Sequence, residues 1–111
     1  MGVDIEQRDD VVILRPQGPN LDLTNHQELS EAFRAALPLE PKRVILDMQR
    51  VVYIDSVGLG SLLGGRRHLR GKVEVHLCGL TEAVEAAIRS ARLDLIFPVH
   101  STVHSALQAV K

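Results

Sequence analysis

Residues 53 to 60 read Tyr-Ile-Asp-Ser-Val-Gly-Leu-Gly, and this stretch decides how the rest of the chain is interpreted. It follows a short, mostly apolar run from Val44 to Met48, which is typical of a buried strand. The Asp55-Ser56 pair then stands where a helix begins, because leucines recur at helical spacing from Leu59 onward. The stretch therefore predicts a segment beside a strand that passes directly into a helix N-terminus, with Ser56 as the capping residue.

The predicted helix has an apolar stripe and a second side that is rich in glycine. The stripe consists of Leu59, Leu62, Leu63 and Leu69, and the glycines are Gly58, Gly60, Gly64 and Gly65. Glycine inside a helix costs up to about 1 kcal/mol relative to alanine, so four of them need a reason. We attribute at most two to core packing and expect Gly60 and Gly64 to leave space for a partner. The basic residues that follow are interpreted as a solvated face: Arg66, Arg67, Arg70 and Lys72.

Before this stretch, the sequence predicts a hairpin and then a helix. Apolar and polar residues alternate from Val3, and residues 11–14 are apolar, as in two paired strands. Thr24 and Gln27 have the spacing of a capping box. Apolar residues then recur at helical spacing until Pro38: Leu29, Phe33, Ala36 and Leu37.

After this stretch, strands and helices continue to alternate. Residues 73–77 predict a half-buried strand, with Glu74 and His76 on its polar side. Thr81 is expected to cap the next helix, whose buried side is predicted to consist of Val84, Ala87, Ile88 and Ala91. Residues 95–97 predict the last strand, and Ser101 opens a final helix with Val103, Leu107 and Val110. The order β-β-α-β-α-β-α-β-α predicts an α/β fold with a mostly parallel mixed sheet of about five strands and about four helices.

Composition favours one small globular domain, residues 1–111, with 45 % hydrophobic and 24 % charged residues. The net charge of -1 and the absence of tryptophan argue against nucleic-acid binding. We expect no membrane insertion, because no apolar run approaches the roughly 20 residues that span a bilayer. Cys78 is the only cysteine and the N-terminus does not resemble a signal peptide, so a cytoplasmic location is expected.

Patterns for catalysis and metal binding fit the sequence poorly. Gly58 and Gly60 suggest a dinucleotide fingerprint, but Leu63 occupies its third glycine position. Neither Ser56 nor Ser61 has the flanking glycines of a hydrolase elbow. The histidines lack the paired spacing of metal ligands and are interpreted as surface residues: His26, His68, His76, His100 and His104. We expect no catalytic residue, cofactor or metal, and therefore no enzyme.

The whole chain resembles the STAS domain of bacterial anti-sigma factor antagonists. The family signature Asp-Ser-(Ser/Thr)-Gly-Leu-Gly matches residues 55–60, with Val57 in place of Ser or Thr, and residues 44–48 and 96–99 support the match. The resemblance implies the STAS fold and phosphorylation of Ser56 by an anti-sigma factor that is a serine kinase. The partner-binding residues that it implies are Asn20, Asp22, Asp55, Val57, Gly58, Leu59 and Gly60. A family element, Gly-Glu-(Leu/Ile)-Asp, is one residue longer in residues 18–22 and has Asn20 where Glu is common.

The resemblance implies a partner switch in a chain that is monomeric when free. The unphosphorylated form would bind the anti-sigma factor kinase and release a sigma factor, and a phosphatase would reset it. A phosphate suits a helix N-terminus, whereas a dianion beside Asp55 would oppose docking of a partner. An alternative remains for each residue. The chain could be an accessory or scaffold STAS domain of a sensory assembly or lipid-transport system, in which Ser56 is only a helix cap. Asp22 could be a turn residue that bonds only its own backbone.

Overall fold

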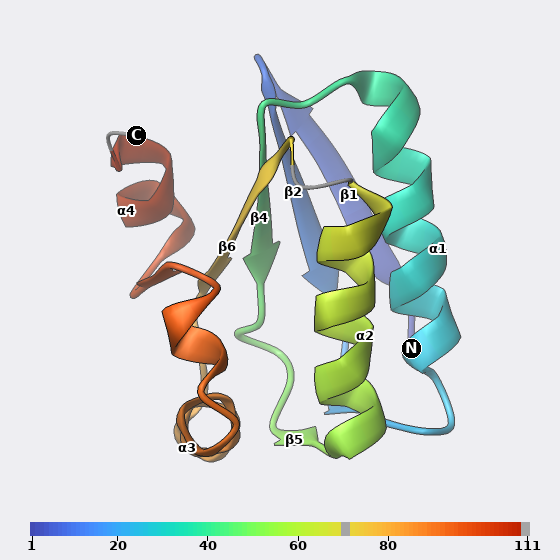
Figure 1. The fold of residues 1–111 in the computed structure, drawn as a ribbon, viewed down its shortest axis with the longest axis vertical. Coiled ribbons are helices and arrows are strands. Elements are labelled where there is room, and N and C mark those ends of the chain that lie inside the picture. The colour runs from blue at the N-terminus through green and yellow to red at the C-terminus, as the bar shows by residue number, and fades with distance from the viewer. Residues whose placement is uncertain (70–71, 110–111) are drawn as a thin grey trace.

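A five-stranded mixed sheet forms the centre of the molecule (Figure 1). The structure, a computed structural model, describes residues 1–69 and 72–109. The sheet has the order β1 (Val3–Arg8), β2 (Val11–Pro16), β4 (Arg43–Asp47), β6 (Glu74–Cys78) and β7 (Val99–His100). β1 runs antiparallel to β2, and the remaining pairs are parallel. This arrangement confirms the predicted α/β class and the mostly parallel sheet of five strands.

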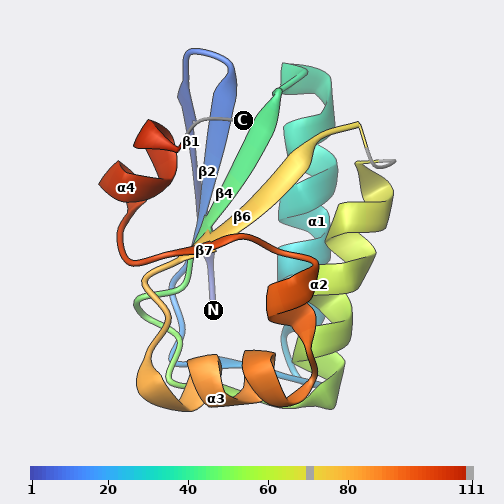
Figure 2. The ribbon, with the colours of Figure 1, turned by 60° about the vertical axis from the view of Figure 1, so that its left-hand side comes forward.

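The helices lie on both faces of the sheet and across one of its ends. In the described residues they are α1 (His26–Ala36), α2 (Ser56–His68), α3 (Glu82–Ser90) and α4 (Val103–Gln108). α1 and α2 cover one face and α4 covers the other, while α3 lies across the end to which the parallel strands point (Figure 2). α2 begins at that same end, so its first residues lie at the carboxyl edge of the sheet (Figure 1).

Two apolar clusters hold these layers together, because successive strand residues face opposite sides of the sheet. The larger cluster lies beneath α1 and α2 and includes Val12, Val44 and Phe33, all fully buried. The smaller cluster lies beneath α4 and consists of Ile13, Ile45, Cys78 and Ala106. β6 is thus covered on both faces, which corrects the predicted half-buried strand.

The predicted last strand at residues 95–97 is wrong. Leu93–Leu95 form a short 3-10 turn, η2, and the strand follows it as β7. The backbone N–H groups of Ile96 and Phe97 both donate to the Leu93 carbonyl, at 2.9 and 2.8 Å. Their hydrogen bonds are therefore local, and the edge strand forms only where the chain reaches the side of β6.

Several helix ends also differ from the sequence prediction. α1 has Asn25 at its N-cap, and the Thr24 hydroxyl donates to Asp22 instead, so no capping box with Gln27 forms. α4 begins after Thr102, whose side chain forms a capping box with Ser105. Thr81 does stand at the N-cap of α3, but its hydroxyl donates to the Val51 carbonyl.

Some of the predicted apolar positions lie outside the core. Leu37 falls in a 3-10 turn, η1 (Leu37–Leu39), and is exposed, while Ala91 is exposed just beyond α3. Val110, predicted on the last helix, and Arg70, in the predicted basic cluster, lie outside the described residues. Arg66, Arg67 and Lys72 are exposed.

Candidate functional site

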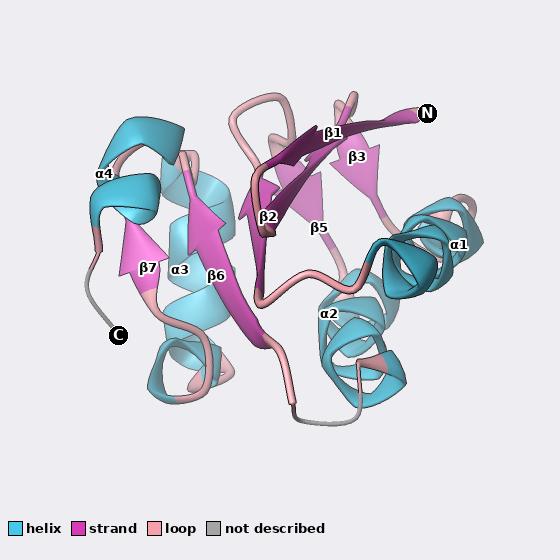
Figure 3. Cartoon of the chain, turned by 90° about the horizontal axis from the view of Figure 1, so that it is seen from above, coloured by secondary structure: helices cyan, strands magenta, loops and turns pink. Residues whose placement is uncertain are grey.

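A short parallel ladder joins the loop before α1 to the start of α2. β3 (Asn20–Leu21) pairs with β5 (Tyr53–Ile54) (Figure 3), with Asn20 opposite Tyr53. Beyond this ladder, the Leu23 N–H donates to Asp55 Oδ2 at 3.2 Å. The segment that contains Asn20 and Asp22 therefore lies beside the N-terminus of α2.

Asp55, and not Ser56, caps α2. Its backbone is extended and its Oδ1 accepts a hydrogen bond from the Gly58 N–H at 2.8 Å, while its carbonyl accepts from the Leu59 N–H at 2.9 Å. The prediction that Ser56 is the cap is wrong. The Asp55 carboxylate, one residue earlier, already accepts the hydrogen bond from the Gly58 N–H that an N-cap side chain would accept.

Ser56 is the first residue of α2, and its side chain is exposed. No hydrogen bond joins its hydroxyl to any other group in residues 1–69 and 72–109. Its own N–H and that of Val57 belong to the open first turn of the helix, which lacks intrahelical partners. The hydroxyl is therefore accessible and has no structural task in the cap.

Asp22 organises the loop on the other side of the ladder. Its Oδ1 accepts from the Thr24 hydroxyl at 2.6 Å and from the Thr24 N–H at 2.9 Å, and its Oδ2 accepts from the Asn20 side chain at 2.8 Å. These hydrogen bonds, with that from the Thr24 hydroxyl foremost, hold the pKa of Asp22 below its usual value. The geometry supports the interpretation of Asp22 as a turn residue that fixes the loop beside Ser56.

The four glycines of α2 fall into two pairs. A Cβ on Gly58 would collide with the Leu21 carbonyl, and one on Gly65 would collide with the Phe33 ring. A Cβ on Gly60 or Gly64 would meet no atom within 4 Å. Two glycines thus allow close packing, which agrees with the expectation that core packing accounts for at most two, and the other two leave the helix surface open.

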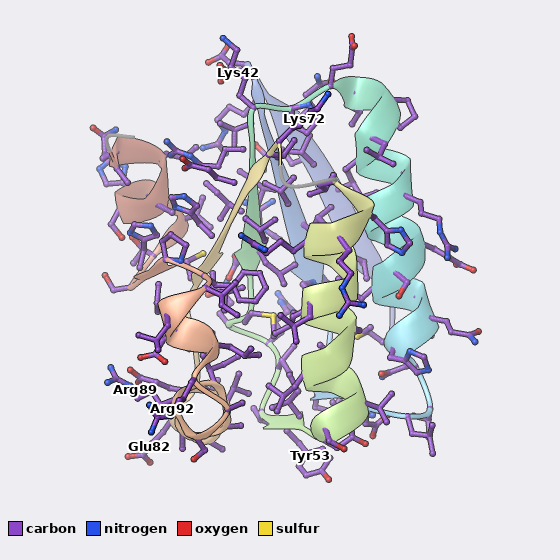
Figure 4. The ribbon with its side chains drawn as sticks, in the orientation of Figure 1. Lys42, Tyr53, Lys72, Glu82, Arg89 and Arg92 are labelled. Carbon is purple, nitrogen blue, oxygen red and sulfur yellow. The ribbon has the colours of Figure 1, made fainter. Side chains whose placement is uncertain are left out.

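Three exposed apolar side chains, here called the apolar rim, lie next to the start of α2. The rim consists of Leu23, Val52 and Tyr53, which are 67 %, 54 % and 56 % exposed. Tyr53 points away from the body of the molecule at the end where α2 begins (Figure 4). Sequence reasoning missed these residues, although part of the signal was present: Val52 and Tyr53 are large apolar residues just before Asp55 in the sequence.

The histidines do not form the surface set that was expected. His76 is 5 % exposed, and its Nδ1 lies 2.9 Å from Nε2 of His100. Within the part of the chain that the structure describes, no group of three or more His, Cys, Asp or Glu side chains could hold a metal ion. In the same residues, no helix has the length and apolar character needed to cross a membrane.

The mixed sheet, the two helices on one face and the Asp-Ser start of α2 define a STAS-type domain. The STAS domain family model matches residues 2–106, so the chain belongs to this family. An anti-sigma factor antagonist from Mycobacterium paratuberculosis has a similar structure, with a TM-score of 0.87 and 26 % identity, over 97 % of this chain and 92 % of that one.

Two further solved structures share the fold at lower identity. The Bacillus cell fate determinant SpoIIAA in its phosphorylated form has a TM-score of 0.72 and 19 % identity, over 99 % of this chain and all of that one. A sulfate transporter family protein from Wolinella succinogenes has a TM-score of 0.79 and 20 % identity, over 91 % of this chain and 84 % of that one. The fold therefore occurs both in regulators and in transporter proteins.

Proposed function

We propose that this protein is an anti-sigma factor antagonist that is switched by phosphorylation of Ser56. The observation that carries the proposal is the exposed hydroxyl of Ser56, which forms no hydrogen bond in the described residues and directly follows the cap. Because Asp55 caps the helix, a phosphate on Ser56 displaces no capping bond. The open first turn and the positive end of the helix dipole favour the added negative charge, so the phosphorylated protein stays folded.

The unphosphorylated site suits a protein partner. The apolar rim provides area that binding would remove from water, and Gly60 lets a partner approach the helix backbone beside Ser56. Phosphorylation places about -1.5 to -2 charges in the middle of this surface, next to the Asp55 carboxylate. A partner that fits a neutral hydroxyl would then be released, since a loss of about 3 kcal/mol lowers affinity more than a hundredfold.

In this proposal the chain is a single domain and not an enzyme. An anti-sigma factor serine kinase supplies ATP and Mg²⁺, binds the unphosphorylated form and thereby releases a sigma factor. A phosphatase removes the phosphate. The structural similarity to a Mycobacterium paratuberculosis anti-sigma factor antagonist at 26 % identity supports this class of partner. The protein acts in the cytoplasm and is a monomer when free.

A second candidate is an accessory or scaffold STAS domain in which Ser56 is never modified. The shared fold with a sulfate transporter family protein favours it. The two candidates differ in one measurable property: the accessory domain has no kinase partner that distinguishes the two states of Ser56.

The test is to incubate the protein with the candidate anti-sigma kinases of its own genome and to locate phosphate by mass spectrometry. We expect one phosphate, on Ser56. Ser56→Asp should keep the circular dichroism spectrum and lose binding to the same kinase. Ser90→Asp, which adds the same charge at an exposed serine that ends α3, serves as the control and should bind like wild type. Labelling elsewhere, or no labelling by any candidate, would favour the accessory domain.

A further inference from the structure

Three ionisable side chains form a hydrogen-bonded row on the sheet face opposite α1 and α2. Glu74 Oε1 lies 2.9 Å from His76 Nε2, and His76 Nδ1 lies 2.9 Å from His100 Nε2. The two ring planes differ by 13° and their centroids are 5.0 Å apart. Because 2.9 Å is shorter than the roughly 3.5 Å between stacked faces, the rings meet edge to edge. We name Glu74, His76 and His100 the histidine relay.

The relay has one proton arrangement when both rings are neutral. The ionised Glu74 carboxylate can only accept, so the Nε2–H of His76 donates to it. Nδ1 of the neutral His76 ring is then an acceptor, and the Nε2–H of His100 donates to it. Both histidines are therefore Nε2–H tautomers, and Nδ1 of His100 is the position that is left to take up a proton.

The relay lies where the C-terminal segment joins the sheet. His100 belongs to the edge strand β7, and α4 begins three residues later. The other end of α4 is held by Arg43, whose Nη1 and Nη2 donate to the carbonyls of Ala106 and Ala109 at 2.9 and 3.2 Å. The β7–α4 segment is thus attached at one end by the relay and at the other by a buried guanidinium.

We propose that the histidine relay makes the docking of the β7–α4 segment dependent on pH, with firm docking when His100 is neutral and detachment favoured when it is protonated. A proton from solvent would bind Nδ1 of His100 and place a positive charge on the sheet face that also carries the buried Arg43 cation, which opposes that charge. Detachment returns that charge to water and separates it from Arg43.

The charged groups around the relay determine the direction of this effect. β6 contributes Glu74 and Cys78, β4 contributes Arg43 and Asp47, and α4 contributes the exposed His104. From α3, Glu85 and Arg89 line the same surface cavity as His100, about 380 Å³ in volume. Burial, then His76 and then Arg43 lower the pKa of His100 below its usual value.

The sign of the pH dependence follows from this lowered pKa. In the detached segment, the pKa of His100 is near its ordinary value of about 6.5. Below about pH 6.5 the detached segment therefore binds more protons than the docked segment. Docking is therefore fully stable above about pH 6.5 and weakens as the pH falls from there to the docked pKa of His100. Each unit by which docking lowers the pKa changes the opening equilibrium by at most about tenfold.

Native-state hydrogen exchange at pH 7.5 and 5.5, corrected for the intrinsic effect of pH on exchange, tests the proposal. The Ala106 amide, bonded to the Thr102 carbonyl, and the Gly79 amide, bonded to the His100 carbonyl, should lose protection at pH 5.5. The amides of β4 that pair with β2 should keep theirs, because they lie in the centre of the sheet. Equal protection at both pH values, or an equal loss in β4, would overturn the proposal.

Two variants and one spectrum make the test specific to the relay. His100→Gln keeps an N–H donor at the reach of Nε2 but cannot titrate, so its protection of Ala106 should no longer depend on pH. His104→Gln, on the exposed side of α4, is the control and should keep the wild-type response. Long-range ¹H–¹⁵N spectra of the wild-type rings at pH 7.5 should show Nε2–H for both His76 and His100. Another pair of tautomers, or an unchanged pH response in His100→Gln, would contradict the proposal.

Discussion

Asp55 and Ser56 are neighbours in sequence, but they have separate roles at the start of α2. The Asp55 side chain satisfies the Gly58 N–H and also accepts from the Leu23 N–H across the ladder. The Ser56 hydroxyl forms no comparable bond in the described part of the chain. Helix capping and the proposed phosphorylation therefore involve different side chains, so each can be changed separately.

The first prediction compares alanine substitutions at these two positions. Ser56→Ala should change the free energy of unfolding by less than about 0.5 kcal/mol, as is usual for an exposed side chain without partners. Asp55→Ala should lower it by about 1 kcal/mol, because the cap is lost. Urea unfolding followed by circular dichroism measures both. A loss of similar size in Ser56→Ala would show that the hydroxyl supports the helix after all.

The second prediction concerns Ser56→Ala in cells that contain the regulatory pathway. The variant lacks the phosphate acceptor but keeps the apolar rim, so it should hold the anti-sigma factor permanently. Transcription that depends on the sigma factor should then stay high without the usual signal. A reporter gene, with protein level measured in parallel, shows the outcome. Output that still follows the signal at normal protein level would favour the accessory domain.

At the scale of the element, α2 has one packed side and one open side. Gly58 and Gly65 bring the helix backbone against the Leu21 carbonyl and the Phe33 ring. Gly60 and Gly64 have no neighbour that a Cβ would touch. The low helix propensity of glycine is therefore offset by close packing at Gly58 and Gly65, whereas Gly60 and Gly64 leave the helix surface open.

The third prediction uses glycines from the two sides of the same helix. Gly58→Ala should lower the free energy of unfolding by about 1 to 3 kcal/mol, because a methyl group has no space there. Gly60→Ala should raise it by up to about 1 kcal/mol, since alanine favours the helix. Gly60→Leu and Gly64→Leu should weaken kinase binding while the melting temperature is kept. A collapse of the melting temperature in the leucine variants would assign these glycines to internal packing.

At the scale of the whole molecule, the sheet separates a large apolar cluster from a small one. The small cluster contains Cys78, fully buried between the sheet and α4. Burial, and then the nearby Asp47 carboxylate, raise the pKa of this thiol to about 12. Since the thiolate is the reactive form, the native fold suppresses the reactivity of Cys78.

The fourth prediction is that Cys78 resists alkylation in the native protein. At pH 8 iodoacetamide should label it only as fast as the structure opens, whereas the protein in urea should react like an ordinary cysteine near its usual pKa of about 8.5. Mass spectrometry of timed samples measures both rates. Rapid labelling of the native protein would mean that the thiol is accessible.

Elements whose signal is local could be predicted from the amino-acid sequence. Alternating apolar residues located β1, the apolar run of residues 11–14 located β2, and the leucine stripe located α2, because each pattern lies in neighbouring residues. The Asp55-Ser56 pair marked the start of α2, because an N-cap side chain bonds a backbone N–H only two or three residues further along the chain. The order of these elements was sufficient to predict the α/β class.

Contacts between segments that are remote in sequence could not be predicted in this way, because they depend on how the chain folds back on itself. Asp55 caps α2 through a local bond from the Gly58 N–H, but its second carboxylate oxygen accepts from the Leu23 N–H across the β3–β5 ladder, and no local pattern predicts that second contact. His76 was expected at the surface, but α4, which begins only at Val103, covers it. Such outcomes depend on groups that are remote in sequence, and no local period or cap pattern encodes which remote segment will cover a given side chain.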